Sequence, residues 1–110
     1  MTITSVATAV EAIPLARPYT IAFRRVEAVE LPIVVLTDDA GRTGLGAASP
    51  ERHVTGETNE ACAAALAGDR LGFLVGADVR DRGRLAERLA RELVATPAAR
   101  AALDIALWDL

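Results

Sequence analysis

The sequence contains no lysine, and all twelve of its basic residues are arginine. A reaction that needs a lysine as a base or as a Schiff-base amine therefore cannot take it from these 110 residues. The single cysteine, Cys62, excludes a disulfide within the chain and is typical of a reducing compartment. No apolar run reaches the length of a membrane span, and the first residues lack the basic start of a signal peptide. We therefore expect a cytoplasmic protein.

Aromatic residues are also scarce, at 4% of the chain against 52% hydrophobic residues. The core must therefore be built mainly from alanine, valine and leucine. The net charge of −3 and the isoelectric point near 5.1 argue against nucleic acid or an anionic membrane as a partner. The length is that of one domain.

The apolar pattern changes its period along the chain, from about two residues in the first half to 3.6 in the second. It predicts strands at about residues 2–13, 26–37 and 43–48, and helices at about 58–67, 70–75 and 81–94. Strands followed by helices indicate an α+β fold, here a three-stranded antiparallel meander with a small helical bundle on one side. Residues 1–95 would form this unit, and residues 96–110 a further helix.

A hairpin around residues 38–41 is the clearest local feature, because Asp38 and Asp39 are typical turn residues and a glycine closes the turn. Gly44 and Gly46 on the returning strand remove side chains, which would let another element come close. Pro32 predicts a bulge or a late strand start. Pro14 and Pro18 predict that residues 15–25 form an ordered loop.

The last helix is apolar on almost every side. Thr96 as a hydroxyl N-cap and Pro97 after it predict its start. Thr58 and Asp81 are predicted to cap the helices at 58–67 and 81–94. A soluble helix with this pattern is expected to be buried on almost all sides. We therefore expect residues 1–110 to be the front part of a larger protein that packs on this helix. Asp104 and Asp109 would then pair with Arg100 and with that further part.

Three arginines in residues 15–25 flank the apolar and aromatic residues Tyr19, Ile21 and Phe23; they are Arg17, Arg24 and Arg25. Guanidinium groups beside aromatic rings can clamp a carboxylate. The alternative is a solvated loop with ordinary salt bridges. His53, the only histidine, lies in a second loop without a partner constellation and is interpreted as a surface or contact residue. Cys62 is interpreted as a small core residue.

Several motifs occur in an order that resembles the enolase superfamily: PLARPY at 14–19, VVLTDDAGRTGLG at 34–46, ASP at 48–50, VTGE at 54–57, LVGAD at 74–78 and ARAALDIALWDL at 99–110. Together they resemble the N-terminal capping domain of the muconate-lactonising subgroup, and the Thr-Gly-Glu is most similar to dipeptide epimerases. Ala47 is a departure, because many relatives have a glutamate there.

The resemblance implies that a (β/α)8 barrel beyond this chain carries the chemistry. In that family, barrel lysines remove and return a proton next to a carboxylate, and three barrel carboxylates hold magnesium, which stabilises an enediolate. Neither the catalytic groups nor the metal ligands would lie in residues 1–110, so the fragment alone would be inactive. The whole protein is expected to be an isomerase and a homo-oligomer.

The resemblance also implies that two loops, residues 15–25 and 48–56, close over the substrate. Tyr19 would supply an aromatic wall and Val54 an aliphatic one, with His53 and Thr55 in the same second loop as further substrate contacts. Arg24 would pair with a substrate carboxylate, which favours a dipeptide with an acidic residue. Muconate cycloisomerase and o-succinylbenzoate synthase are enzymatic alternatives. A stand-alone dimerisation or binding module is an alternative of another class.

Overall fold

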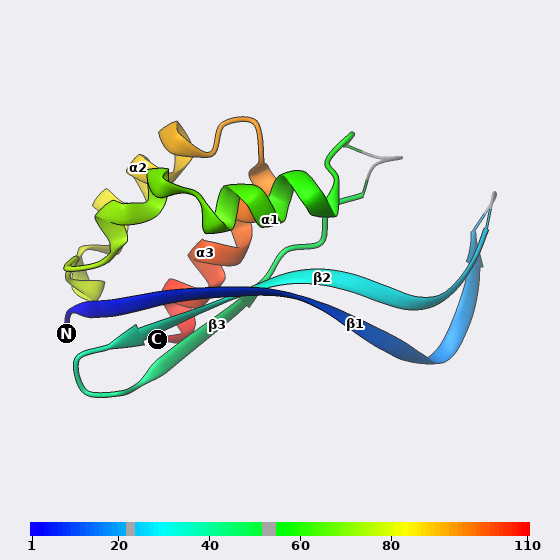
Figure 1. The fold of residues 1–110 in the computed structure, drawn as a ribbon, viewed down its shortest axis with the longest axis horizontal. Helices are drawn as coiled ribbons and strands as arrows, with labels where there is room; N and C mark the ends of the chain where they lie inside the picture. Colours follow the sequence, from blue (N-terminus) through cyan, green and yellow to red (C-terminus); the bar gives the residue numbers. More distant parts are fainter. Residues whose placement is uncertain (22–23, 52–54) are drawn as a thin grey trace.

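The computed structural model describes residues 1–21, 24–51 and 55–110, and gives only the backbone of residues 18–21 and 24–27. It confirms the α+β fold. Three antiparallel strands, β1 (Ile3–Ile21), β2 (Arg24–Asp38) and β3 (Thr43–Ala47), form one sheet in the order β1-β2-β3 (Figure 1). The strands are joined in chain order, as the predicted meander requires.

The prediction of a loop over residues 15–25 was wrong, because β1 and β2 continue through most of it as a two-stranded ribbon. β1 is an edge strand, so a proline whose missing N–H would point outward removes no bond from the sheet. The pairing instead becomes irregular between Pro14 and Tyr19, whose partners are Ala28 and Val26. The additional residues lie on β1, which is the pattern of a bulge.

The bulge predicted at Pro32 is also absent from the described pairing, which is regular through this residue. The carbonyl of Pro32 accepts a hydrogen bond from the amide of Ala48 at 2.8 Å, just past the end of β3. An N–H of residue 32 would point to this same side, where β3 has ended. The proline therefore removes at most one bond at the end of the ladder.

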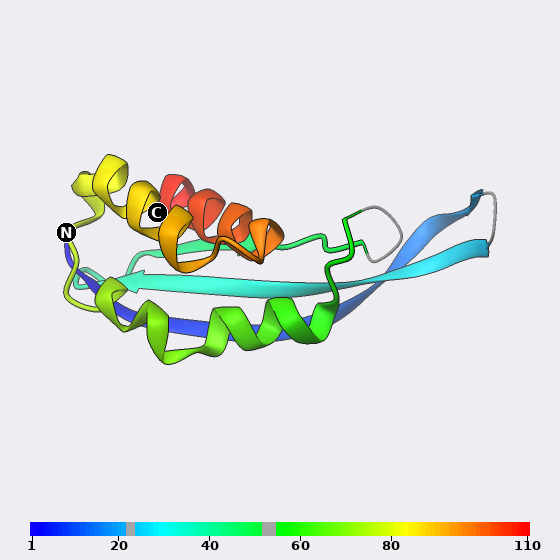
Figure 2. The ribbon, with the colours of Figure 1, turned by 90° about the horizontal axis from the view of Figure 1, so that it is seen from above.

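Helices cover one face of the sheet (Figure 2). They are α1 (Asn59–Ala67), α2 (Arg82–Glu92) and α3 (Pro97–Asp109), with short 3-10 helices at Asp69–Leu74 and Val79–Asp81. Thr58 caps α1 as predicted, since its hydroxyl accepts the amide of Ala61 at 3.1 Å. Asp81 and Thr96 occupy the N-cap positions of α2 and α3, so the predicted starts of both helices are confirmed. Neither side chain makes a capping hydrogen bond, which the prediction of a side-chain cap had required. In the described part of the chain, no helix is long and apolar enough to cross a membrane.

The core lies between the sheet and the helices. It is aliphatic, as the composition predicts, and its large members include Ile3, Val34, Leu36, Leu66, Leu74, Leu85, Leu89, Leu93, Leu103 and Leu107.

Helix α3 lies on β3, where two glycines remove the side chains between them. An ideal Cβ on Gly46 would lie 1.8 Å from the carbonyl oxygen of Ala102, and one on Gly44 would lie 2.2 Å from that of Ala106. The predicted close approach is thus confirmed. The expectation that α3 is buried on nearly all sides is met on one side only, because Ile105 is 51% and Trp108 66% exposed.

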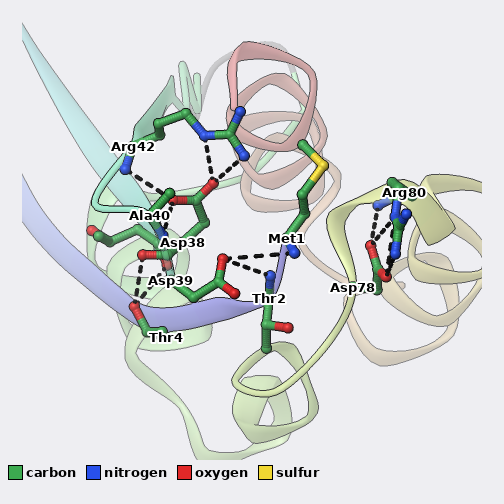
Figure 3. Close-up of polar contacts among 10 residues, drawn as sticks. Met1, Thr2, Thr4, Asp38, Asp39, Ala40, Arg42, Asp78 and Arg80 are labelled. Atoms are coloured by element: carbon green, nitrogen blue, oxygen red, sulfur yellow. Dashed lines mark hydrogen bonds and ion pairs between the residues drawn. The ribbon is translucent and has the colours of Figure 1, made fainter.

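The β2–β3 turn is held by carboxylates (Figure 3). The buried side chain of Asp38 accepts the amides of Ala40 and Arg42 at 3.0 and 2.9 Å and pairs with the Arg42 guanidinium at 2.7 Å. Asp39 contacts the chain's first residues, at 3.6 Å from the N-terminal amine and 3.2 Å from the amide of Thr2. Both aspartates are therefore turn residues, as predicted.

Candidate functional site

The two segments predicted to contact a substrate extend toward the same end of the molecule. β1 and β2 project beyond the helices as a ribbon. The described residues between β3 and α1, 48–51 and 55–58, are called the β3–α1 segment, and they lie toward that same end, opposite to both chain ends (Figure 1, Figure 2). The ribbon end and this β3–α1 segment are therefore placed where they could meet one ligand.

The backbone of Tyr19 pairs with Val26, and that of Arg24 with Ile21, so both predicted site residues stand on paired strands rather than in a loop. Their side chains are outside the description, and their roles stay predictions. Arg17 is described and exposed. His53 and Val54 lie outside the described residues, and their roles also stay predictions.

Thr55 is the predicted site residue whose side chain the structure describes, and it is exposed. Its amide donates to the carbonyl of Glu51 at 2.9 Å. Its hydroxyl lies 2.9 Å from Oε1 of Glu57 and 3.3 Å from the carbonyl of Glu51. Gly56, between Thr55 and Glu57, has φ of +79°, which a glycine adopts without strain. Thr55 thus holds the stem of the β3–α1 segment in a closed turn.

Glu57 joins this turn to helix α3. Its Oε2 accepts the backbone amide of Ala98 at 2.8 Å, in the first turn of the helix. The cap that Thr96 does not supply is therefore supplied from a residue far away in sequence. The sequence interpretation missed this role, because a cap is normally sought in the residue just before the helix. The Thr-Gly-Glu motif at residues 55–57 marks Glu57 in the sequence, but nothing in the motif indicates that its partner is the amide of Ala98.

The start of α1 lies beside this region. The Asn59 side-chain nitrogen lies 3.5 Å from Oε2 of Glu30 on β2, and Oδ1 of Asn59 has no partner among the described residues. Cys62, one turn further on, is 1% exposed. Burial, then the nearby charge of Glu57, raises the pKa of the Cys62 thiol to about 11, although a hydrogen bond from the Ala99 backbone opposes the shift. The thiol is a protonated core group, as predicted, and not a nucleophile.

Asp109 has a different role from the predicted ion pair. Its Oδ2 accepts the amide of Leu45 at 2.9 Å, on the open edge of β3. The end of α3 is thereby bonded to the edge strand. In the described part of the chain, Arg100 makes no ion pair with Asp104 or Asp109.

The described residues, 1–21, 24–51 and 55–110, contain no group of three or more histidine, cysteine, aspartate or glutamate side chains that could hold a metal ion. A groove of about 400 Å³ lies between α2 and α3, with Arg100 and Asp104 as its charged residues. It contains none of the predicted site residues. The described residues therefore form a scaffold that positions two segments, without a catalytic constellation of their own.

Comparison with known proteins identifies relatives over nearly the whole chain. A family described as "Mandelate racemase / muconate lactonizing enzyme, N-terminal domain" matches residues 3–110. The L-Lys-D/L-Arg epimerase of Methylococcus capsulatus is 57% identical over 110 residues, which is 100% of this chain and 31% of that protein. The L-Ala-D/L-Glu epimerase of Clostridium acetobutylicum is 34% identical over 89% of this chain and 27% of its own length.

A solved structure agrees with these relatives. The dipeptide epimerase from Methylococcus capsulatus, in complex with Mg and the dipeptide L-Arg-D-Lys, superimposes with a TM-score of 0.90 and 57% identity over 97% of this chain and 30% of its own. The chain thus spans about a third of the length of the proteins that it matches.

Proposed function

This chain belongs to the family of mandelate racemase / muconate lactonizing enzyme N-terminal domains, and from that premise we propose that it is the substrate-capping domain of a dipeptide epimerase-like isomerase. The observation that carries the proposal is the 57% identity, over the full 110 residues, with an L-Lys-D/L-Arg epimerase. The geometry supports it, since the ribbon end and the β3–α1 segment extend toward one end of the domain.

In this proposal, the domain binds and encloses the substrate while the chemistry takes place elsewhere in the protein. The chain has no lysine to act as a base, and its described residues hold no set of metal ligands. We therefore assign proton removal next to the substrate carboxylate, and the magnesium site, to a barrel domain that residues 1–110 do not include. The exposed face of α3, with Ile105 and Trp108, would pack against that barrel.

The proposed substrate is a dipeptide, whose side chains could be either basic or acidic. The 57% identical relative is named for lysine and arginine, which favours a basic dipeptide and is our first choice. The second candidate is an acidic dipeptide, which the arginines of the ribbon favour. Arg24 could pair with a side-chain carboxylate, a contact worth roughly 1.5–3 kcal/mol when it is shielded from water.

The test uses the whole protein, whose coding sequence should continue past Leu110 into a barrel. Loss of the α-proton would be followed by NMR as exchange with deuterium in D2O, with Mg²⁺ present, for L-Arg-L-Lys and for L-Ala-L-Glu. Exchange and epimerisation of either dipeptide support the proposal, and their ratio chooses between the candidates. Turnover of muconate, or of the precursor of o-succinylbenzoate, without exchange of the α-proton of either dipeptide would overturn the proposal.

We further propose a cytoplasmic, homo-oligomeric protein, as the lone buried thiol and the resemblance suggest. Sedimentation of residues 1–110 tests the competing dimerisation module. A folded, symmetric dimer of this fragment alone would count against the capping role.

A further inference from the structure

We propose that Glu57 is a positioning residue: it fixes the stem of the β3–α1 segment on the first turn of α3 and so sets which dipeptide side chains the protein accepts. The inference rests on the proposed capping function. Its structural basis is a carboxylate that joins two parts of the chain, with Oε1 at 2.9 Å from the Thr55 hydroxyl and Oε2 at 2.8 Å from the Ala98 amide.

The first backbone N–H of helix α3 has no acceptor within the helix, and its partner is the carboxylate of Glu57, far away in the sequence. Thr96 makes no capping bond, and Pro97 has no N–H to offer, so the amide of Ala98 is the first donor of the helix. Glu57 is half-buried where it accepts this amide. A carboxylate is favoured at this end of a helix, because the unsatisfied N–H groups carry partial positive charge.

The hydroxyl of Thr55 has a single hydrogen and two acceptors within reach. The carboxylate of Glu57 is closer than the carbonyl of Glu51 and is the charged acceptor, so the bond to Glu57 is the stronger one. The amide of Thr55 already donates to the carbonyl of Glu51. Residues 51, 55 and 57 are thereby joined into one turn, which Glu57 attaches to α3.

The other end of the β3–α1 segment is also fixed. Ala48 is buried, and its amide donates to the carbonyl of Pro32 on β2. Helix α3 itself is held against β3 at Gly44 and Gly46. Both ends of the segment are therefore attached to the same sheet. Ala48 bonds β2 directly, and Glu57 bonds α3, which packs on β3. Loss of the carboxylate would release one end, and small displacements at a substrate contact are costly.

The test compares Glu57→Ala with Glu57→Gln in the whole protein, using L-Arg-L-Lys and L-Ala-L-Glu as substrates. We expect Glu57→Ala to raise KM for the better dipeptide about tenfold, with a smaller effect on kcat, and to change the ratio of kcat/KM between the two dipeptides about threefold or more. Glu57→Gln keeps an oxygen acceptor for Ala98 and should recover most of this loss.

A stability control separates positioning from capping alone. Val79 is buried in the 3-10 helix Val79–Asp81, outside the β3–α1 segment, and Val79→Ala should lower the melting temperature without changing KM or the substrate ratio. If Glu57→Ala behaves like Val79→Ala, Glu57 is only a cap and the inference is overturned.

Amide hydrogen exchange provides a readout that does not need activity. Faster exchange at Ala98 and Thr55 in Glu57→Ala supports the bridge, and unchanged exchange at both overturns it. A wild-type protein that epimerises no dipeptide would refute the proposed function, and the exchange rates would still decide whether Glu57 holds the segment.

Discussion

The contact of α3 with β3 allows a specific prediction for Gly46→Ala. The new Cβ would lie 1.8 Å from the Ala102 carbonyl oxygen, 2.8 Å from its carbon and 3.0 Å from the Ala106 nitrogen. All three atoms are backbone, so no side chain can rotate away. Helix α3 or strand β3 would have to move by more than about 1 Å to restore ordinary contact distances.

The cost follows from what moves with the helix. Leu103 and Leu107 are 0% and 1% exposed, so lifting α3 off the sheet also opens the core beneath it. Overpacking alone costs typically about 1–3 kcal/mol. Because backbone must yield and packing is lost as well, we expect Gly46→Ala to lower the free energy of unfolding by about 3 kcal/mol or more.

Urea unfolding followed by circular dichroism measures this difference. Gly83→Ala is the matched control, because an added Cβ there meets no atom within 4 Å and the residue lies in α2, where alanine is the better helix former. The control should leave stability unchanged or raise it by up to about 1 kcal/mol. A Gly46→Ala protein within about 0.5 kcal/mol of wild type would refute the close packing of α3 on β3.

Other predictions concern caps and ionisable groups. Thr58→Ala should cost about 1 kcal/mol by thermal unfolding, whereas Thr96→Ala, which removes no capping bond, should cost clearly less; equal losses would contradict the assignment. Burial raises the pKa of Asp38, but its bonds from Arg42 and Ala40 outweigh burial and the pKa lies below its ordinary value. The stability it contributes is therefore present at neutral pH and lost as the pH falls below about 4, so Asp38→Asn and wild type should converge in acid unfolding curves. The Cys62 pKa of about 11 predicts that stability declines between about pH 9 and 11, and that iodoacetamide labels the thiol at pH 8 only in urea; rapid labelling of the folded protein would contradict its burial.

Much of the fold could be predicted because local signals and packing agree. Three features were recognisable from the local sequence alone. They are the turn at residues 38–41, the close approach at the two glycines on β3, and the buried face formed by the leucines of α2. The ribbon was mispredicted because Pro14 and Pro18 were treated as terminating residues. Whether a proline terminates a strand depends on which neighbour its missing N–H would face, and that is a property of the sheet and not of the local sequence.

The site was less predictable, for a related reason. Thr55 was named from the sequence, but its partner Glu57 also bonds the amide of Ala98, 41 positions further along the chain. Asp109 was expected to form an ion pair and instead bonds the edge of β3. Such tertiary hydrogen bonds leave no periodic pattern. The roles of Tyr19, Arg24, His53 and Val54 stay predictions for the experiments above.

The ribbon also bears on how such a domain can change over evolutionary time. The ends of β1 and β2 project beyond the helices (Figure 1). Val10 and Ile13 on β1 are exposed, whereas Ile3, near the start of the same strand, is fully buried in the core. Under the proposed capping function, substitutions toward the ribbon end would therefore alter recognition at little cost to folding. A domain arranged in this way can acquire a new preference by a few replacements while its melting temperature hardly changes, so divergence of specificity need not wait for compensating mutations.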